Sequence, residues 1–146
     1  MHYWKFWLSS HAESYWELEE HGIGSGRLVP TGRKLPVDAA KWDLRVPRPL
    51  DFQLDDVLTD LRMEEGWTKM KVYDPTADVT VLYSSNESFR HICVYTRESG
   101  PIAIEPYTCT TDAFNLESRG IESGVIALEP GKEWSGTIVI APRKGN

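Results

Sequence analysis

The chain has 146 residues, which is enough for one domain with a hydrophobic core. Its 16 basic and 22 acidic side chains give a formal net charge of -6, and the Lys and Arg residues are scattered, which argues against a nucleic-acid-binding surface. No apolar run approaches the length of a membrane-spanning helix, and the amino terminus does not have the charged-then-apolar pattern of a signal peptide. We therefore expect a soluble, cytoplasmic protein with neither a membrane nor a nucleic-acid partner.

The first sixteen residues are rich in aromatic side chains. Such crowding is typical of core strands or of a surface on which a sugar ring stacks, and we favour a pair of core strands. The aromatic residues are Tyr3, Trp4, Phe6, Trp7, Tyr15 and Trp16. The glycine-rich segment 22–32 follows. It lacks the strand-then-helix context of a phosphate-binding loop, so we expect a plain connection there.

Residues 54–61 have the spacing of a short amphipathic helix. Leu54, Val57, Leu58 and Leu61 fall at positions i, i+3, i+4 and i+7, with acidic residues between them. We expect one or two helical turns, or a turn, in this segment.

From about Thr68 onward, short apolar runs alternate with turn residues, a pattern that indicates an antiparallel β-sandwich. The expected strands are 69–73, 79–83, 92–95, 102–104, 124–128 and 136–140. Cys93 and Cys109 fall in or beside these runs without the close spacing of a metal-binding knuckle. We expect both to be free, buried thiols, and we expect no metal.

One stretch combines acid, hydroxyl, amide and aromatic groups at short range, and Glu105 is its most informative residue. In an extended strand Ala103 and Glu105 point to one face, while Ile102 and Ile104 point to the other. The small side chain of Ala103 leaves room for a ligand beside the carboxylate. Pro106 restrains the backbone of Glu105 to extended conformations. The carboxylate is therefore held on a stiff scaffold.

Several motifs resemble one enzyme family in the same order along the chain. They are residues 15–18 (Tyr-Trp-Glu-Leu), 29–37, 43–45, 48–50, 54–61, the run Glu105-Pro-Tyr-Thr-Cys-Thr-Thr-Asp-Ala-Phe-Asn-Leu116, 124–131 and 134–136. Together they resemble the carboxy-terminal part of bacterial aldose 1-epimerases, the mutarotases, over roughly residues 15–140.

The resemblance implies a mainly β, antiparallel sandwich of the galactose mutarotase-like supersandwich type, with residues 1–146 forming a single truncated domain. It also implies an isomerase that interconverts the α and β anomers of a free aldohexose without a cofactor. A Glu takes the proton from the anomeric hydroxyl while a His protonates the ring oxygen, each such group contributing roughly 10²–10⁴-fold. By this resemblance Glu105 is the general base and Asp55 binds sugar hydroxyls.

The chain also departs from the family pattern. Family members are much longer, and their first half supplies a sugar-binding Arg and the acidic His. His2, in the run His-Tyr-Trp-Lys-Phe, is the candidate for that acid. We expect His11, His21 and His91 to be structural or exposed to solvent.

Further candidates for sugar binding are Tyr107, Asp112 and Asn115, although Asp112 and Asn115 could equally form a turn. An alternative to the enzyme is a truncated, catalytically incomplete relative that binds carbohydrate or self-associates through exposed sheet edges. A phosphosugar epimerase would need a basic cluster beside Glu105, for which Arg90, Arg97 and Arg119 are the nearby candidates. A glycosidase using Glu105 and Asp112 would need carboxyl groups roughly 5–9.5 Å apart.

Overall fold

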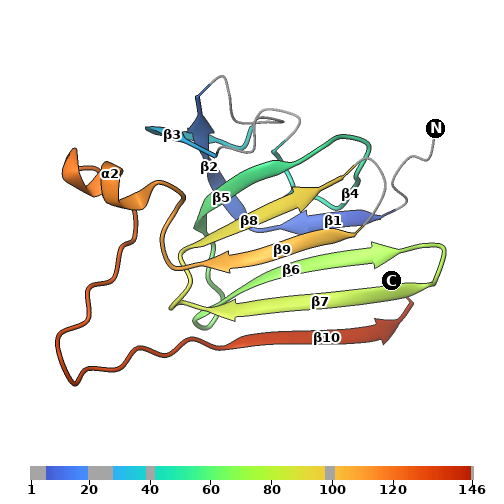
Figure 1. The fold of residues 1–146 in the computed structure, drawn as a ribbon. Coiled ribbons are helices and arrows are strands. Elements are labelled where there is room, and N and C mark those ends of the chain that lie inside the picture. Colours follow the sequence, from blue (N-terminus) through green and yellow to red (C-terminus); the bar gives the residue numbers. More distant parts are fainter. Residues whose placement is uncertain (1–5, 20–27, 39–41, 98–100, 146) are drawn as a thin grey trace.

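The computed structural model describes residues 6–19, 28–38, 42–97 and 101–145. Within these ranges the chain forms β1 (Trp7–Ser10), β2 (Ala12–Leu18), β3 (Pro30–Pro36), β4 (Arg48–Pro49), β5 (Asp55–Leu61), β6 (Trp67–Asp74), β7 (Val79–Asn86), β8 (His91–Thr96), β9 (Ile102–Tyr107), α2 (Ala113–Ser118) and β10 (Ile138–Lys144). Figure 1 shows the strands in two layers and the long extended connection that leads from α2 to β10. Strands therefore dominate the fold.

The strands form two antiparallel sheets of five. In sheet A the order is β10-β7-β6-β1-β4, and in sheet B it is β3-β2-β5-β8-β9. Consecutive strands β6 and β7 pair, as do β8 and β9, whereas β1 and β2 lie in different sheets. The expected antiparallel β-sandwich is confirmed.

The main core lies between the sheets. Sheet A contributes Leu8, Met70 and Tyr83, and sheet B contributes Leu58 and Ile92 among others. We call the sheet faces that meet here the inner faces. Of the aromatic residues near the amino terminus, Tyr15 is buried and stacks on Trp42 with ring centroids 4.2 Å apart, whereas Trp7 is 43% exposed. Tyr3 and Trp4 lie outside the described residues.

The expectation of helical turns at 54–61 is wrong, because this segment forms the strand β5. As the central strand of sheet B, β5 is buried on both sides: Leu58, and Leu54 just before the strand, face the main core, and Val57 faces a second cluster. Because side chains alternate between the two faces of a strand, Leu54 and Leu58 fall on one face and Val57 on the other. The apolar spacing at 54, 57, 58 and 61 is therefore compatible with a strand as well as with a helix.

Most of the expected strands are present, with two differences near the carboxyl end. The runs expected at 69–73, 79–83, 92–95 and 102–104 fall within β6, β7, β8 and β9. Residues 124–128 are not a strand, because no described strand lies beside them to pair with their backbone. The last strand begins at Ile138, two residues later than expected, and continues to Lys144.

A second hydrophobic cluster lies on the opposite side of sheet B, which we call the outer face. It consists of Trp16 from β2, Val57 from β5, Cys93 from β8 and Leu116 from α2. All four side chains are almost completely buried. The short helix α2 is therefore attached to the sheet through Leu116.

We predict that Leu116→Ala destabilises the protein by about 2–5 kcal/mol, because it leaves a cavity over Trp16 and Val57. Phe114 lies on the same helix but is 80% exposed, so Phe114→Ala is the matched control and should change stability by less than about 0.5 kcal/mol. Urea unfolding followed by Trp fluorescence measures both. Equal stability of the two variants would contradict this account of how α2 is held.

Candidate active site on the outer face of sheet B

The alternation of side chains along three neighbouring strands brings the two predicted carboxylates to the same face. Val57 of β5 is the register partner of Cys93, and Cys93 is the partner of Glu105 on β9. Asp55 lies two residues before Val57 and therefore projects from the same face. Asp55 and Glu105 thus lie on either side of β8, on the outer face of sheet B.

The carboxylate of Glu105 is oriented by a neighbour on its own strand. Tyr107 donates a hydrogen bond from its hydroxyl to Oε2 of Glu105 over 2.7 Å. Burial and this hydrogen bond raise the pKa of Tyr107 well above its usual range, so the phenol stays protonated. Tyr107 is consequently a permanent donor that holds the Glu105 carboxylate in one orientation.

Cys93 lies between the two carboxylates and is buried, as expected from the sequence. Burial, followed by the negative charges of Glu105 and Asp55, raises the pKa of its thiol to about 12. The thiol is therefore protonated at neutral pH and is a poor nucleophile. Its role in the second cluster is packing. Cys109 is free but only partly buried.

The residues around Asp55 include one aromatic side chain that the sequence did not single out. Tyr95 is the register partner of both Asp55 and Ala103, and it is only partly buried. The side chain of Arg97 covers part of it, with a hydrogen bond of 2.8 Å from Nε to the Tyr95 hydroxyl. The alternation of His91, Cys93 and Tyr95 along β8 is the signal that could have placed this ring on the outer face.

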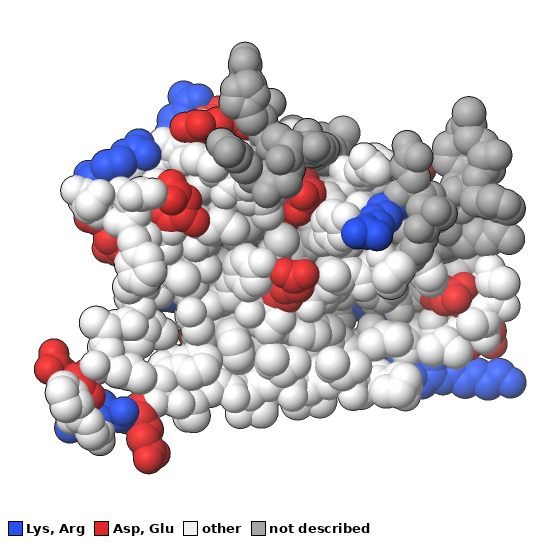
Figure 2. All heavy atoms as spheres, in the orientation of Figure 1, with Lys and Arg blue, Asp and Glu red and all other residues white. Residues whose placement is uncertain are grey.

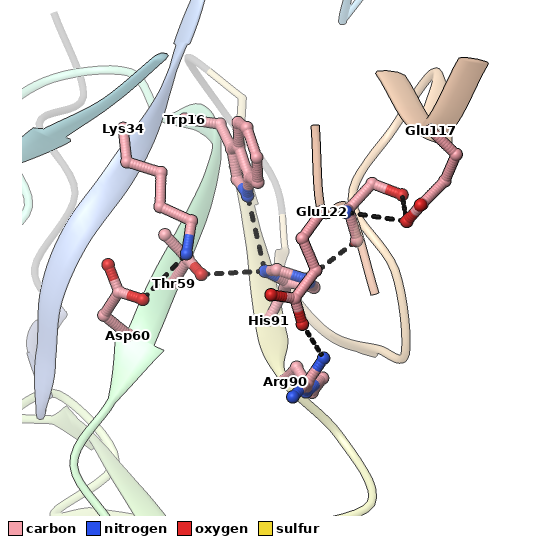
Figure 3. Close-up of polar contacts among 9 residues, drawn as sticks. Trp16, Lys34, Thr59, Asp60, Arg90, His91, Glu117 and Glu122 are labelled. Carbon is pink, nitrogen blue, oxygen red and sulfur yellow. Dashed lines mark hydrogen bonds and ion pairs between the residues drawn. The ribbon is translucent and has the colours of Figure 1, made fainter. Parts of the chain in front are cut away.

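His91 lies on the same face, but its ring is occupied by protein partners. The Trp16 indole N–H donates to Nδ1 over 3.4 Å, and the Thr59 hydroxyl lies 2.9 Å from the same nitrogen. On the other side Nε2 lies 3.1 Å from the carbonyl oxygen of Ser123. Because Nδ1 accepts from Trp16, the ring proton belongs on Nε2, which donates to Ser123. Figure 3 shows the ring held from these directions.

The contacts of His91 continue into the loop after α2. Ser123 donates from its backbone N–H and its hydroxyl to Oε1 of Glu117, over 2.9 and 2.8 Å. Gly124 has a φ of 91°, and a Cβ there would come within 2.5 Å of the Thr108 carbonyl oxygen. Only glycine permits this close turn. His91 is thus a structural histidine that attaches the loop to the sheet, in agreement with expectation.

A cleft of about 320 Å³ lies at the His91 end of the outer face. Its lining includes two ion pairs, Lys34 with Asp60 at 2.9 Å and Arg90 with Glu122 at 2.7 Å. Figure 3 shows both pairs beside His91. Neither Glu105 nor Asp55 is among the described residues that line it. The cleft and the two carboxylates are therefore separate features of one face.

Two other predicted sugar-binding residues, Asp112 and Asn115, lie at the start of α2. Asp112 and Asn115 are exposed and bond to each other over 2.5 Å at the start of α2, with Asp112 at a φ of 53°. His11 lies 3.8 Å from Glu64. His2 and His21 lie outside the described residues. The carboxylate of Asp112 and the carboxamide of Asn115 thus bond each other within a local turn.

The three arginines considered for a phosphosugar site each contact another group of the protein. The guanidinium of Arg90 bonds Glu122, that of Arg97 bonds Tyr95, and that of Arg119 donates to the Thr31 carbonyl over 2.9 Å. Among the described residues no group of three or more His, Cys, Asp and Glu side chains could hold a metal ion. Nor does any helix in these ranges have the length and apolar character needed to cross a membrane.

Comparison with solved structures identifies the fold. The chain is similar to the crystal structure of a galactose mutarotase-like protein from Clostridium acetobutylicum, with a TM-score of 0.75 and 15% sequence identity. The similarity covers 96% of this chain and 42% of that protein, so the chain spans less than half of its neighbour's length. No family model matches the sequence. The protein therefore has a galactose mutarotase-like fold, as the sequence motifs predicted.

We predict that stability falls as the pH is lowered from 6.5 to about 4 because of His91. Burial lowers the pKa of His91 from 6.5 to about 4, so between these values the unfolded chain binds a proton that the folded protein does not. The loss is about 1.4 kcal/mol per pH unit, or about 3 kcal/mol in all.

Urea unfolding at several pH values measures this effect. In the His91→Gln variant the unfolding free energy should fall less steeply over this range, by about 1.4 kcal/mol per pH unit. The His11→Gln variant retains His91 and should keep the wild-type dependence. A pH profile that is identical in all three proteins would contradict the assignment.

Proposed function

We propose that the chain binds a free aldohexose on the outer face of sheet B and interconverts its α and β anomers, with Glu105 as the general base. The observation that carries this proposal is the placement of Glu105 and Asp55 on one sheet face, with the Tyr107 hydroxyl 2.7 Å from Glu105. The galactose mutarotase-like fold of the neighbouring structure supports it.

The proposed chemistry needs only proton transfers. Glu105 removes the proton from the anomeric hydroxyl, the bond between the anomeric carbon and the ring oxygen breaks, and the ring oxygen takes up a proton. Rotation about the first carbon–carbon bond and reclosure give the other anomer. Asp55 accepts hydrogen bonds from sugar hydroxyls, and Tyr95 offers the aromatic face on which an apolar sugar face stacks. Glu105 stays aligned throughout because Tyr107 holds its carboxylate.

The two histidines among the described residues already have protein partners, and this favours a second candidate function. Both nitrogens of His91 are engaged by Trp16, Thr59 and Ser123, and His11 lies beside Glu64. A chain whose acid is missing would bind the sugar without efficient ring opening. The second candidate is therefore a carbohydrate-binding protein with the same fold, and His2 is the proposed acid if the chain is an enzyme.

We predict that Glu105→Gln lowers the rate of anomer exchange at least about 10²-fold, because it removes the base while keeping the size of the side chain. Exchange between α- and β-glucose or galactose is followed by NMR. Asp112→Asn is the matched control, because its carboxylate is exposed and bonds Asn115 in a local turn. This variant should exchange the anomers at the wild-type rate.

The same samples separate the two candidates. Ligand-detected NMR reports sugar binding independently of exchange, and Asp55→Asn should weaken binding in either case. Sugar binding without any acceleration of exchange by the wild-type protein would favour the binding protein. Equal exchange rates for the wild-type protein and Glu105→Gln would remove Glu105 from the mechanism. Neither binding nor exchange would overturn both candidates.

A further inference from the structure

Strand β10 leaves one edge of sheet A open and apolar. Among the described strands it pairs only with β7. Ile138 is the register partner of Ser85 and Ile140 of Tyr83, so both isoleucines project from the inner face, yet they are 42% and 66% exposed. Sheet B does not cover them. An open edge strand with exposed β-branched residues can pair with a strand of another chain.

The other three sheet edges are less suited to pairing. Strand β4 is only two residues long. Strand β3 begins and ends with proline and contains Gly32, Arg33 and Lys34. Strand β9 includes Pro106, which has no N–H to donate. The edge formed by β10 is therefore the one on which an added strand would find both backbone groups and apolar side chains.

Hydrogen bonds at the two ends of β10 show which backbone groups are free. Asn86 donates its N–H to the carbonyl oxygen of Thr137 over 3.0 Å, and Gly145 donates to Asp78 over 2.9 Å. Odd-numbered residues of β10 thus point their backbone groups toward β7, and even-numbered residues point theirs outward. The outward N–H groups belong to Ile138, Ile140 and Lys144, since Pro142 has none.

We propose that β10 is a homodimer interface, in which the β10 strands of two copies pair antiparallel about a two-fold axis at Val139. In this register Ile138 lies opposite Ile140 of the second copy, and each of these residues both donates and accepts a backbone hydrogen bond. The four isoleucines come together on the inner face, and the two copies of sheet A become one continuous sheet of ten strands.

Charge complementarity favours a second copy as the occupant. The same register places Lys144 opposite Trp134 of the other copy, and Arg143 diagonally across from Glu133. Ser88 donates to the carbonyl oxygen of Ser135 over 2.9 Å, and the Trp134 ring packs edge-on against Phe89 at 5.5 Å. The segment before β10 is therefore already attached to the turn that follows β7.

Glu133 and Trp134 of one copy thus lie beside Arg143 and Lys144 of the other. In Figure 2 the band along β10 carries almost no charge except for the basic side chains at the carboxyl end of the strand. The arrangement is self-complementary, as an isologous interface requires. The proposal does not depend on the sugar chemistry of the opposite sheet.

Analytical ultracentrifugation over a range of protein concentrations tests the interface. We expect a wild-type dimer and at least a tenfold weaker association for Ile140→Lys, which places a charge in the apolar centre. Val46→Lys is the matched control, because Val46 is 72% exposed and lies outside β10. It should leave the dimer intact. Circular dichroism confirms that both variants fold.

Two further variants test the register. Glu133→Arg and Arg143→Glu should each weaken the dimer, and the double variant should restore it, because the exchanged charges meet again across the axis. In a Cys109→Ser background, Val139→Cys should form a disulfide between copies, since residue 139 meets itself at the axis. Ala141→Cys, which would lie opposite Thr137, should not. A monomeric wild-type protein, a dimer unaffected by Ile140→Lys, or equal cross-linking of both cysteine variants would overturn the proposal.

Discussion

The burial of β5 on both of its faces is the constraint on which the rest of the structure depends. Leu54 and Leu58 pack into the core between the sheets, while Val57 packs with Trp16, Cys93 and Leu116 on the outer face. A strand in this position cannot rotate or slip by one residue without exchanging its two sets of contacts. The same constraint therefore fixes the registers of β2 and β8, which pair with β5 on either side.

The second cluster divides the outer face into regions with different chemistry. Leu116 covers Val57 and Cys93 at the centre of the face, so polar side chains remain accessible only around it. Asp55 of β5 and Glu105 of β9 lie on either side of β8, near Tyr95, and the cleft with its two ion pairs lies at the His91 end of the face. His91 stands next to the cluster and joins the sheet to the loop after α2. A sugar site on this face is limited to what the helix leaves open.

Among the described strands, the edge of sheet A formed by β10 is both unpaired and apolar. In sheet A the apolar residues of β10 extend beyond the cover that sheet B provides, and the structural neighbour contains much additional chain besides the matched part. Burial of apolar area is the main favourable contribution to folding and association alike. The exposed isoleucines are therefore the part of sheet A at which further burial would contribute most, whereas the outer face of sheet B carries polar side chains around its central cluster.

The sequence by itself determined the sandwich class, most strands from β6 to β9, and the common face of Ala103 and Glu105, because alternation and turn residues are local signals. It did not determine β5, since an apolar spacing of three and four suits a doubly buried strand as well as a helix. Nor could it show that His91 bonds Trp16 and Ser123, that Asp112 bonds Asn115, or that residues 124–128 have no strand beside them. Only the tertiary structure decided these points, because each depends on which distant segments become neighbours when the two sheets pack together.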